Sequence, residues 1–326
     1  MNYSYYLGID ISKNHLDLSL IDSSNFRQDY HCLNTAEAVS ETLLQISSTH
    51  NKLLLCAEFT GMYGFNLIQA ALSLKLSLWM ENPAQIKYSS GIQRGKNDPV
   101  DAWRIACYSL RFCDRAQLMR VQHETIEQLA YLDSERTLLV ADRGKYKAQL
   151  SDQQGYMPAH IWQEKAHRLQ QLIQSFEQHI TAIEQRMLSL IDDDEMLARQ
   201  MELLQSIPGV GPRLGCYMVI ATQGFCRFKN AKAICCHAGI APFAHHSGDN
   251  THTRARVSHY ADKRLKMLLH LAALSVIQHP GELKTYYQRK CEEGKSKMSV
   301  INAVRSKLVH RMFAVVMRGE KYVPDY

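Results

Sequence analysis

The order of strand-like and helix-like segments near the start of this chain constrains its fold more than any other feature. Residues 5–12 (Y-Y-L-G-I-D-I-S) are apolar on both faces, as in a central strand, and residues 16–21 alternate as an antiparallel strand. The segments that follow read alternately as helix and strand, at 36–46, 53–57, 65–74 and 76–80. A hairpin followed by this alternation predicts an α/β sheet with an antiparallel edge.

Length and composition are those of a globular protein large enough for two domains. The 326 residues are 46% hydrophobic and 21% charged. No apolar run is long enough to cross a bilayer, so we expect a cytoplasmic protein without a membrane partner. The nine cysteines include no C-x-x-C pair, which favours buried thiols in a reducing compartment over a zinc site or a disulfide framework.

The formal net charge of +6 is unevenly distributed along the chain. Residues 203–326 contain 19 Lys or Arg and 7 Asp or Glu, a net charge of +12, which leaves −6 for residues 1–202. A basic C-terminal part joined to an acidic N-terminal part suggests that the C-terminal part binds a polyanion. A scattered, solvated surface charge is the simpler alternative, and charge alone does not exclude it.

Four carboxylates mark a candidate metal site in the N-terminal part. Asp10 and Glu58 stand at or beside the ends of predicted strands, where open α/β sheets bind ligands. In the stretch R-G-K-N-D-P-V-D-A-W-R, Pro99 suits a first helical turn, and Asp98 and Asp101 share one helix face. Asp98 and Asp101 can equally be an ordinary N-cap and an acidic residue in the first turn of a helix. If the four converge, cations must neutralise them, and oxygen ligands select Mg²⁺ or Mn²⁺.

From residue 124 to 202 the composition changes to that of long amphipathic helices. Pro158 separates two of them, and apolar residues in the second recur at three- and four-residue steps. A spacer and dimerisation arm is one interpretation, and packing of the two helices within one chain is the other. We therefore expect three parts, at residues 1–123, 124–202 and 203–326.

The C-terminal part combines a glycine turn with a polar loop in basic surroundings. The run L-L-Q-S-I-P-G-V-G-P is typical of a helix-hairpin-helix, in which Gly209 and Gly211 let backbone N–H groups meet a phosphate. A tight turn between packed helices explains it too. Ser247 lies in the turn-forming run S-G-D-N after His245 and His246, and a plain loop is the simple interpretation. Basic residues that follow would surround a bound DNA phosphate: Arg254, Arg256, Lys263 and Arg264.

Taken in order, G-I-D-I-S, A-E-x-T-G, K-N-D-P-V-D-A, I-P-G-V-G-P and A-G-I-A-P…S-G resemble a transposase of the insertion-sequence-110 family, the bridge-RNA-guided recombinases. The resemblance spans essentially the whole chain. It implies a ribonuclease-H-like (RuvC-like) N-terminal domain, a helical coiled-coil arm and a mainly α C-terminal transposase domain. It also implies a D-E-D-D tetrad, at Asp10, Glu58, Asp98 and Asp101, and a nucleophilic serine, at Ser247. The F-A-H-H step before the serine departs from the Arg or Lys expected in many relatives.

The resemblance implies a mechanism and partners. Ser247 would form a phosphoserine with a DNA strand, assisted by Mg²⁺ or Mn²⁺ at the tetrad, which allows strands to be rejoined without ATP. A structured noncoding guide RNA would choose the target. The assembly would be a homodimer or homotetramer, in which the serine and the carboxylates can come from different subunits.

Three other functions remain open. A RuvC-like junction resolvase or nuclease would use water as nucleophile and leave Ser247 structural. An actin-like sugar kinase would use G-I-D-I-S as a phosphate loop, but no second D-x-G-T loop follows. A non-enzymatic DNA-binding scaffold would use only the helix-hairpin-helix.

Overall fold

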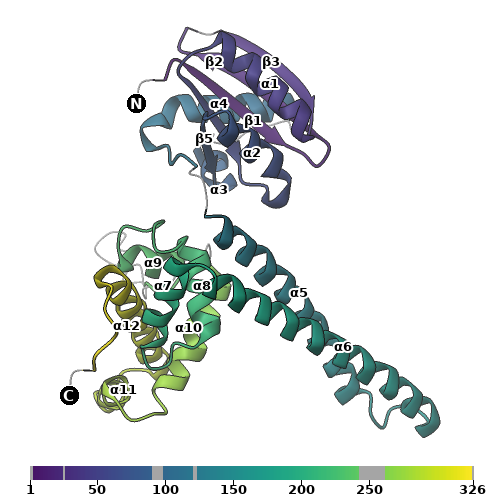
Figure 1. Ribbon diagram of the computed structural model, residues 1–326, viewed down its shortest axis with the longest axis vertical. Helices are drawn as coiled ribbons and strands as arrows, with labels where there is room; N and C mark the ends of the chain where they lie inside the picture. The colour runs from purple at the N-terminus through teal and green to yellow at the C-terminus, as the bar shows by residue number, and fades with distance from the viewer. Residues whose placement is uncertain (1–2, 25, 90–97, 120–122, 242–260, 325–326) are drawn as a thin grey trace, which may run out of the picture. The chain divides into compact units, whose positions relative to one another are not determined.

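A computed structural model describes residues 3–24, 26–89, 98–119, 123–241 and 261–324 of the chain. The chain divides into two compact units, Met1–Val121 and Gln122–Tyr326 (Figure 1). The second unit includes the helical arm together with the C-terminal helices. The finer division into three parts remains a prediction.

The first unit is built on a five-stranded mixed sheet with the order β3-β2-β1-β4-β5. The strands are β1 (Tyr5–Ile11), β2 (His15–Asp22), β3 (Arg27–Leu33), β4 (Leu53–Glu58) and β5 (Ser77–Glu81). β2 runs antiparallel to both β1 and β3, whereas β1, β4 and β5 are parallel. The expected α/β sheet with an antiparallel edge is confirmed. β3 was not predicted, because it is an edge strand whose residues are mostly exposed and show little apolar alternation.

Helices cover both faces of this sheet (Figure 1). α1 (Ala36–Thr49) and α2 (Phe65–Ser73) pack on the face formed by Leu7, Ile9 and Leu55. α4 (Asp98–Phe112) packs on the opposite face, through Ile105 and Ala106. Shorter segments complete the unit: η1 (Gly61–Gly64), α3 (Pro83–Ser89) and η2 (Cys113–Arg115).

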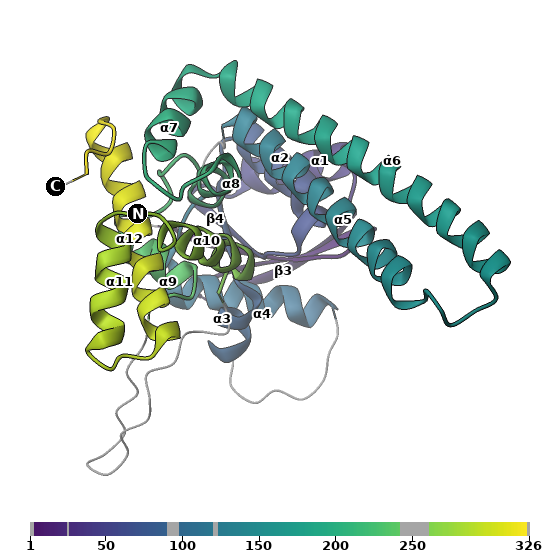
Figure 2. The ribbon, with the colours of Figure 1, turned by 90° about the horizontal axis from the view of Figure 1, so that it is seen from below.

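The second unit begins with a helical hairpin, α5 (Glu124–Asp152) and α6 (Ala159–Asp192), which lie side by side (Figure 2). Pro158 is the N-cap of α6, as expected of a residue that separates two helices. The apolar stripe of α6 is buried at Leu169, Ile173 and Ile180. The arm therefore packs within one chain, and its use in dimerisation remains a prediction.

In the described part of the chain, six further helices form a bundle with the inner end of this hairpin. They are α7 (Glu195–Gln205), α8 (Pro212–Thr222), α9 (Ala231–His237), α10 (Lys263–Val276), α11 (Glu282–Glu292) and α12 (Lys297–Arg318). The expected turn between two helices lies between α7 and α8. Gly209 there has φ +87°, and a Cβ on it would lie 2.9 Å from the Val276 Cβ, so glycine suits both the turn and its packing on α10. Among the described residues, no helix is both long and apolar enough to cross a membrane.

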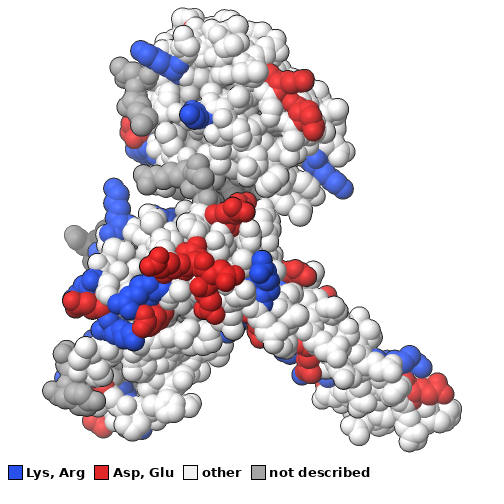
Figure 3. Space-filling view, in the orientation of Figure 1, with Lys and Arg blue, Asp and Glu red and all other residues white. Residues whose placement is uncertain are grey.

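A buried ion-pair cluster joins the hairpin to the bundle. The Asp133 carboxylate on α5 is 5% exposed, accepts a hydrogen bond from Arg264 Nη2 of α10 at 2.7 Å, and forms an ion pair with Arg264 Nη1 at 2.6 Å. Arg213 of α8 lies 3.3 Å from the same carboxylate. Buried charges require such partners, so this cluster fixes α5, α8 and α10 together. On the surface of the second unit, acidic side chains gather in one group with basic side chains beside it (Figure 3).

Candidate active site at the carboxyl end of the sheet

Asp10 and Glu58 occupy neighbouring parallel strands at the same edge of the sheet. The register pairs Ile9 with Ala57, so one further residue brings Asp10 of β1 beside Glu58, the last residue of β4. Neighbouring strands are about 4.8 Å apart, and both carboxylates point to the face that α4 covers. Both side chains are half-buried.

Close backbone packing aligns α4 with β1. A Cβ on Gly8 would lie 2.1 Å from the Ala102 carbonyl oxygen, so only glycine allows this approach. The Tyr6 hydroxyl donates to the Cys113 Sγ at 3.7 Å, beyond the C-terminal end of α4. α4 therefore runs antiparallel to β1, and its first turn lies towards Asp10.

The start of α4 carries the other two carboxylates predicted from the sequence. The distance along the helix axis from Ala102 back to Asp98 is about 6 Å, and the distance along the strand from Gly8 to Asp10 is about 6.6 Å. The helix start is thus at the level of Asp10. The Asp101 carboxylate accepts a hydrogen bond from Arg104 at 2.6 Å, while the side chain of Asp98 is outside the described part.

A fifth carboxylate lies in the same row and was not predicted. Glu81, the last residue of β5, pairs in register with Glu58 and points to the same sheet face. Its Oε2 accepts a hydrogen bond from the Tyr108 hydroxyl of α4 at 3.1 Å, and its Oε1 accepts one from the Asn82 N–H at 2.6 Å. Glu81 therefore ties the end of β5 to α4. An acidic residue directly after the strand run 76–80 was the available signal.

The negative charges in this row of carboxylates change the pKa of the Cys56 thiol. Burial raises the pKa of Cys56, and the nearby charges of Glu81 and then Glu58 raise it further. Burial also raises the pKa of Tyr108 to about 12, with the charge of Glu81 the next cause. Negative charge thus gathers on this face, and an additional anion there requires cations.

The donor set suits a hard divalent cation, although the described side chains do not form a closed site. Carboxylate oxygens are the ligands that Mg²⁺ and Mn²⁺ accept. Among the described residues, no group of three or more His, Cys, Asp or Glu side chains is close enough together to hold a metal ion. Asp101 is hydrogen-bonded to Arg104, and Glu81 is hydrogen-bonded to Tyr108. These bonds must rearrange before more than two carboxylates can bind one ion.

Exposed apolar side chains border the row of carboxylates. They follow Glu58 directly, and their exposed fractions are 60% for Phe59, 77% for Met62 and 48% for Phe65. Large apolar groups left in water beside polar groups mark an interaction surface, and aromatic rings offer faces on which nucleotide bases stack.

The predicted nucleophile lies outside the described residues. Ser247 belongs to residues 242–260, as do His245, His246, Arg254 and Arg256. The two stems of this segment are held together: the Asp262 N–H donates to the His237 carbonyl at 2.9 Å, and the Tyr217 hydroxyl donates to the Asp262 carboxylate at 3.0 Å. The described residues on either side of residues 242–260 are therefore bonded to each other.

The remaining residues predicted to bind DNA differ in their surroundings. Lys263 is exposed, whereas the Arg264 guanidinium is paired with Asp133 and stacks on the Tyr217 ring at 4.8 Å. Arg264 thus holds α10 to α5 in this structure. Gly211 is the N-cap of α8, and a Cβ on it would meet no atom within 4 Å. DNA contacts by these residues remain predictions.

Two models of transposase families match the chain. The DEDD transposase model of the IS110 type matches residues 7–154, and the model described as transposase IS116/IS110/IS902 family matches residues 201–288. Together they cover the sheet, the first arm helix and most of the C-terminal bundle. The chain belongs to the IS110 transposase family. Its first unit has the mixed α/β sheet that the sequence predicted, within the residues that the DEDD transposase model matches.

Curated relatives agree with this membership. The chain is 27% identical over 325 residues to the pilin gene-inverting protein of Moraxella bovis, and equally to that of Moraxella lacunata, covering 97% of each chain. It is 30% identical over 137 residues to an insertion element IS900 protein of Mycobacterium paratuberculosis, which covers 42% of this chain and 34% of that one. The RuvC structure of Thermus thermophilus has a TM-score of 0.28 and 13% identity, covering 35% of this chain and 99% of that chain.

Proposed function

We propose that this transposase cleaves and rejoins DNA through a phosphoserine formed at Ser247. The observation that carries the proposal is the row of carboxylates at the end of the sheet: Asp10 lies beside Glu58, and the close contact at Gly8 brings the start of α4 to the same level. A carboxylate row of this kind suits phosphoryl transfer, in which charge on the phosphate must be neutralised.

Asp10, Glu58, Asp98 and Asp101 would hold Mg²⁺ or Mn²⁺ in this account. The bound cations would neutralise the charge that develops on the phosphodiester. Glu81 holds Tyr108, and through it keeps α4 in place over the sheet. Arg104 holds Asp101 until the site is filled.

Ser247 supplies the nucleophile. Its hydroxyl attacks the phosphorus and gives up its proton to a base, while the bond from phosphorus to the deoxyribose oxygen breaks and that oxygen takes up a proton and leaves as a hydroxyl. The covalent ester keeps the free energy of the phosphodiester, so a second strand can be joined without ATP. The printed name of the Moraxella relatives, a gene-inverting protein, is consistent with cutting followed by rejoining.

Target choice would come from a structured noncoding guide RNA, with the protein in a homodimer or homotetramer. Ser247 is 146 residues after Asp101 and belongs to the other compact unit. A composite site, in which one subunit supplies the serine and another the carboxylates, is compatible with this separation.

Substituting Ser247 distinguishes this function from that of a nuclease using water. We expect Ser247→Ala to retain DNA binding but to lose both strand cleavage and the protein–DNA adduct. Continued metal-dependent cleavage by Ser247→Ala would instead assign the water-using junction nuclease.

A further inference from the structure

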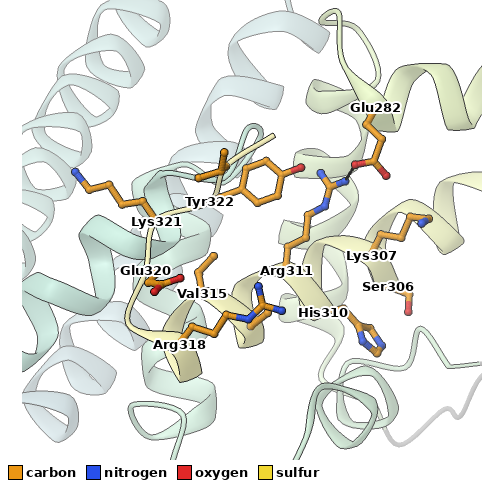
Figure 4. A pocket seen from close by; sticks show the side chains of 12 residues that line it. Glu282, Ser306, Lys307, His310, Arg311, Val315, Arg318, Glu320, Lys321 and Tyr322 are labelled. Atoms are coloured by element: carbon orange, nitrogen blue, oxygen red, sulfur yellow. Dashed lines mark hydrogen bonds and ion pairs between the residues drawn. The ribbon is translucent and has the colours of Figure 1, made fainter. Parts of the chain in front are cut away.

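A groove of about 790 Å³ runs along α12 in the second unit (Figure 4). The C-terminal tail, residues 320–323, forms part of its other wall. We call it the α12 groove. Its lining is Glu282, Ser306, Lys307, His310, Arg311, Ala314, Val315, Arg318, Glu320, Lys321, Tyr322 and Val323.

The α12 groove lies in a basic stretch of the C-terminal part. Residues 282–321 contain 10 Lys or Arg and 4 Asp or Glu, a net charge of +6 and so half of the +12 of residues 203–326. Lys307, Arg311 and Arg318 are spaced by four and seven residues, which places them on one side of α12. The lining itself has four Lys or Arg and two Glu.

Two of these four cations already have acidic partners. Arg311 is paired with Glu282 and stacks on the Tyr322 ring at 4.8 Å, as Figure 4 shows. Lys321 lies 2.6 Å from Glu202 of α7 and points away from the groove. These pairs neutralise two positive charges and shape the walls.

The other two cations are available to an anion. Lys307 lies over the Tyr286 ring at 4.7 Å, and neither it nor Arg318 has an ion pair with a described acid. They are separated by 11 residues, about 16 Å along the helix, with His310 between them. That length corresponds to several nucleotides of a strand.

The tail wall is fixed before any ligand binds. Arg199 of α7 donates to the Gly319 carbonyl at 2.8 Å, and the Tyr322 N–H donates to the Ser206 hydroxyl at 2.8 Å. A preformed groove binds at a smaller entropic cost than one that must first be ordered.

One end of the groove adjoins the stem of the Ser247 segment. Ser306, in the lining, lies 3.6 Å from the Cys235 thiol of α9, and Asn302 donates to the Ile240 carbonyl at 2.7 Å. Ile240 is two residues before Pro242, where the segment begins. A strand lying in the groove would therefore pass close to Ile240.

We propose that the α12 groove binds the phosphate backbone of the DNA strand whose phosphodiester Ser247 attacks, with Lys307 and Arg318 as its main phosphate contacts. The link to Ser247 rests on the proposed function. The DNA binding rests on the groove's own charge, shape and preformed walls.

The test measures the affinity of the full chain for a short, end-labelled single-stranded DNA at several salt concentrations. Each lost phosphate contact reduces the salt slope by about 0.7, so Lys307→Gln with Arg318→Gln reduces it by about 1.4, which is roughly 25-fold in affinity at about 0.1 M salt. The matched control, Lys145→Gln with Arg168→Gln, removes the same charge from exposed positions on the arm and leaves affinity and slope unchanged. Thermal melts check that all variants fold.

Equal slopes and affinities for the groove and control variants would overturn the proposal. The proposal would also be overturned if the groove variant lost affinity only for an RNA oligonucleotide of the same sequence and not for the DNA. Ser247→Ala separates the two proposals, because it should bind the DNA as tightly as the unsubstituted chain. If the unsubstituted chain formed no covalent adduct, the proposed function would fail, whereas the salt slopes would still report on the groove.

Discussion

Gly8 of β1 and Ala102 of α4 are in backbone contact: a Cβ on Gly8 would lie 2.1 Å from the Ala102 carbonyl oxygen and 2.2 Å from the Ala106 nitrogen. Because both obstacles are backbone, Gly8→Ala can be accommodated only if α4 moves. We expect it to lower the free energy of unfolding by about 1–3 kcal/mol, measured by urea denaturation. Strand cleavage should fall further than stability does, because the start of α4 moves away from Asp10.

Gly144→Ala is the control for this substitution. Gly144 lies within α5, where a Cβ would meet no atom within 4 Å, so alanine should stabilise the helix by about 0.5–1 kcal/mol. If Gly8→Ala were equally well tolerated, the close contact would not set the position of α4.

Tyr108→Phe tests whether Glu81 positions α4. The substitution keeps the ring beside Trp79 and Phe112, at 5.2 and 5.0 Å, but removes the hydrogen bond to Glu81. We expect a loss of about 1 kcal/mol in unfolding free energy and a weaker response to Mg²⁺. If the affinity for Mg²⁺, measured by calorimetry, were unchanged, the bond between Tyr108 and Glu81 would contribute to packing but not to metal binding.

The pH dependence offers a second readout for Tyr108. Its pKa is raised from 10.0 to about 12, chiefly by burial, so the folded state favours the neutral phenol. The stability that this contributes is complete below about pH 10 and is lost as the pH rises towards 12. In Tyr108→Phe, the decline of stability over that range should be shallower than in the unsubstituted chain.

Asp133→Ala should be far more damaging than its exposed counterpart on the same helix. It leaves Arg213 and Arg264 without their buried partner, which costs about 3–5 kcal/mol. Asp142→Ala removes only the exposed pair with Lys145, a cost of about 1 kcal/mol or less. Similar urea midpoints for the two variants would show that the cluster does not hold the arm to the bundle.

Divalent cations should stabilise the first unit through Asp10 and Glu58. At a Mg²⁺ concentration of about 100 times Kd, binding adds about 2.7 kcal/mol to the free energy of unfolding. Asp10→Asn and Glu58→Gln should each abolish most of this increase, as measured by thermal shift. Asp114→Asn removes an exposed carboxylate of the same unit and should leave the shift intact. A full shift in Asp10→Asn would argue against a metal site there.

The sequence identified the strands whose apolar residues are buried, and missed the strand whose residues are not. β1 and β4 are apolar on both faces because helices cover both, whereas β3 is a polar edge strand. Glu81 was missed because the expected strand ended one residue earlier, at Met80. Its relation to Glu58 depends on strand register, which local pattern does not specify.

Long-range pairing explains the other differences. Asp133 was not singled out from the sequence, because its partners lie 80 and 131 residues away in the sequence. Arg264 was predicted to contact DNA because it lies on the basic helix after the Ser247 loop. Its guanidinium is bonded to Asp133, and the DNA contact stays a prediction. Helical periodicity indicates which face is apolar, but not which charged residue that face will bury.

The most direct test of the central claim is capture of a covalent protein–DNA adduct on a denaturing gel. The full chain, with its guide RNA and a labelled DNA containing the element junction, should form an adduct that requires Mg²⁺ or Mn²⁺, Ser247 and both Asp10 and Glu58. Cleavage without any adduct, or an adduct that persists in Ser247→Ala, would contradict the account.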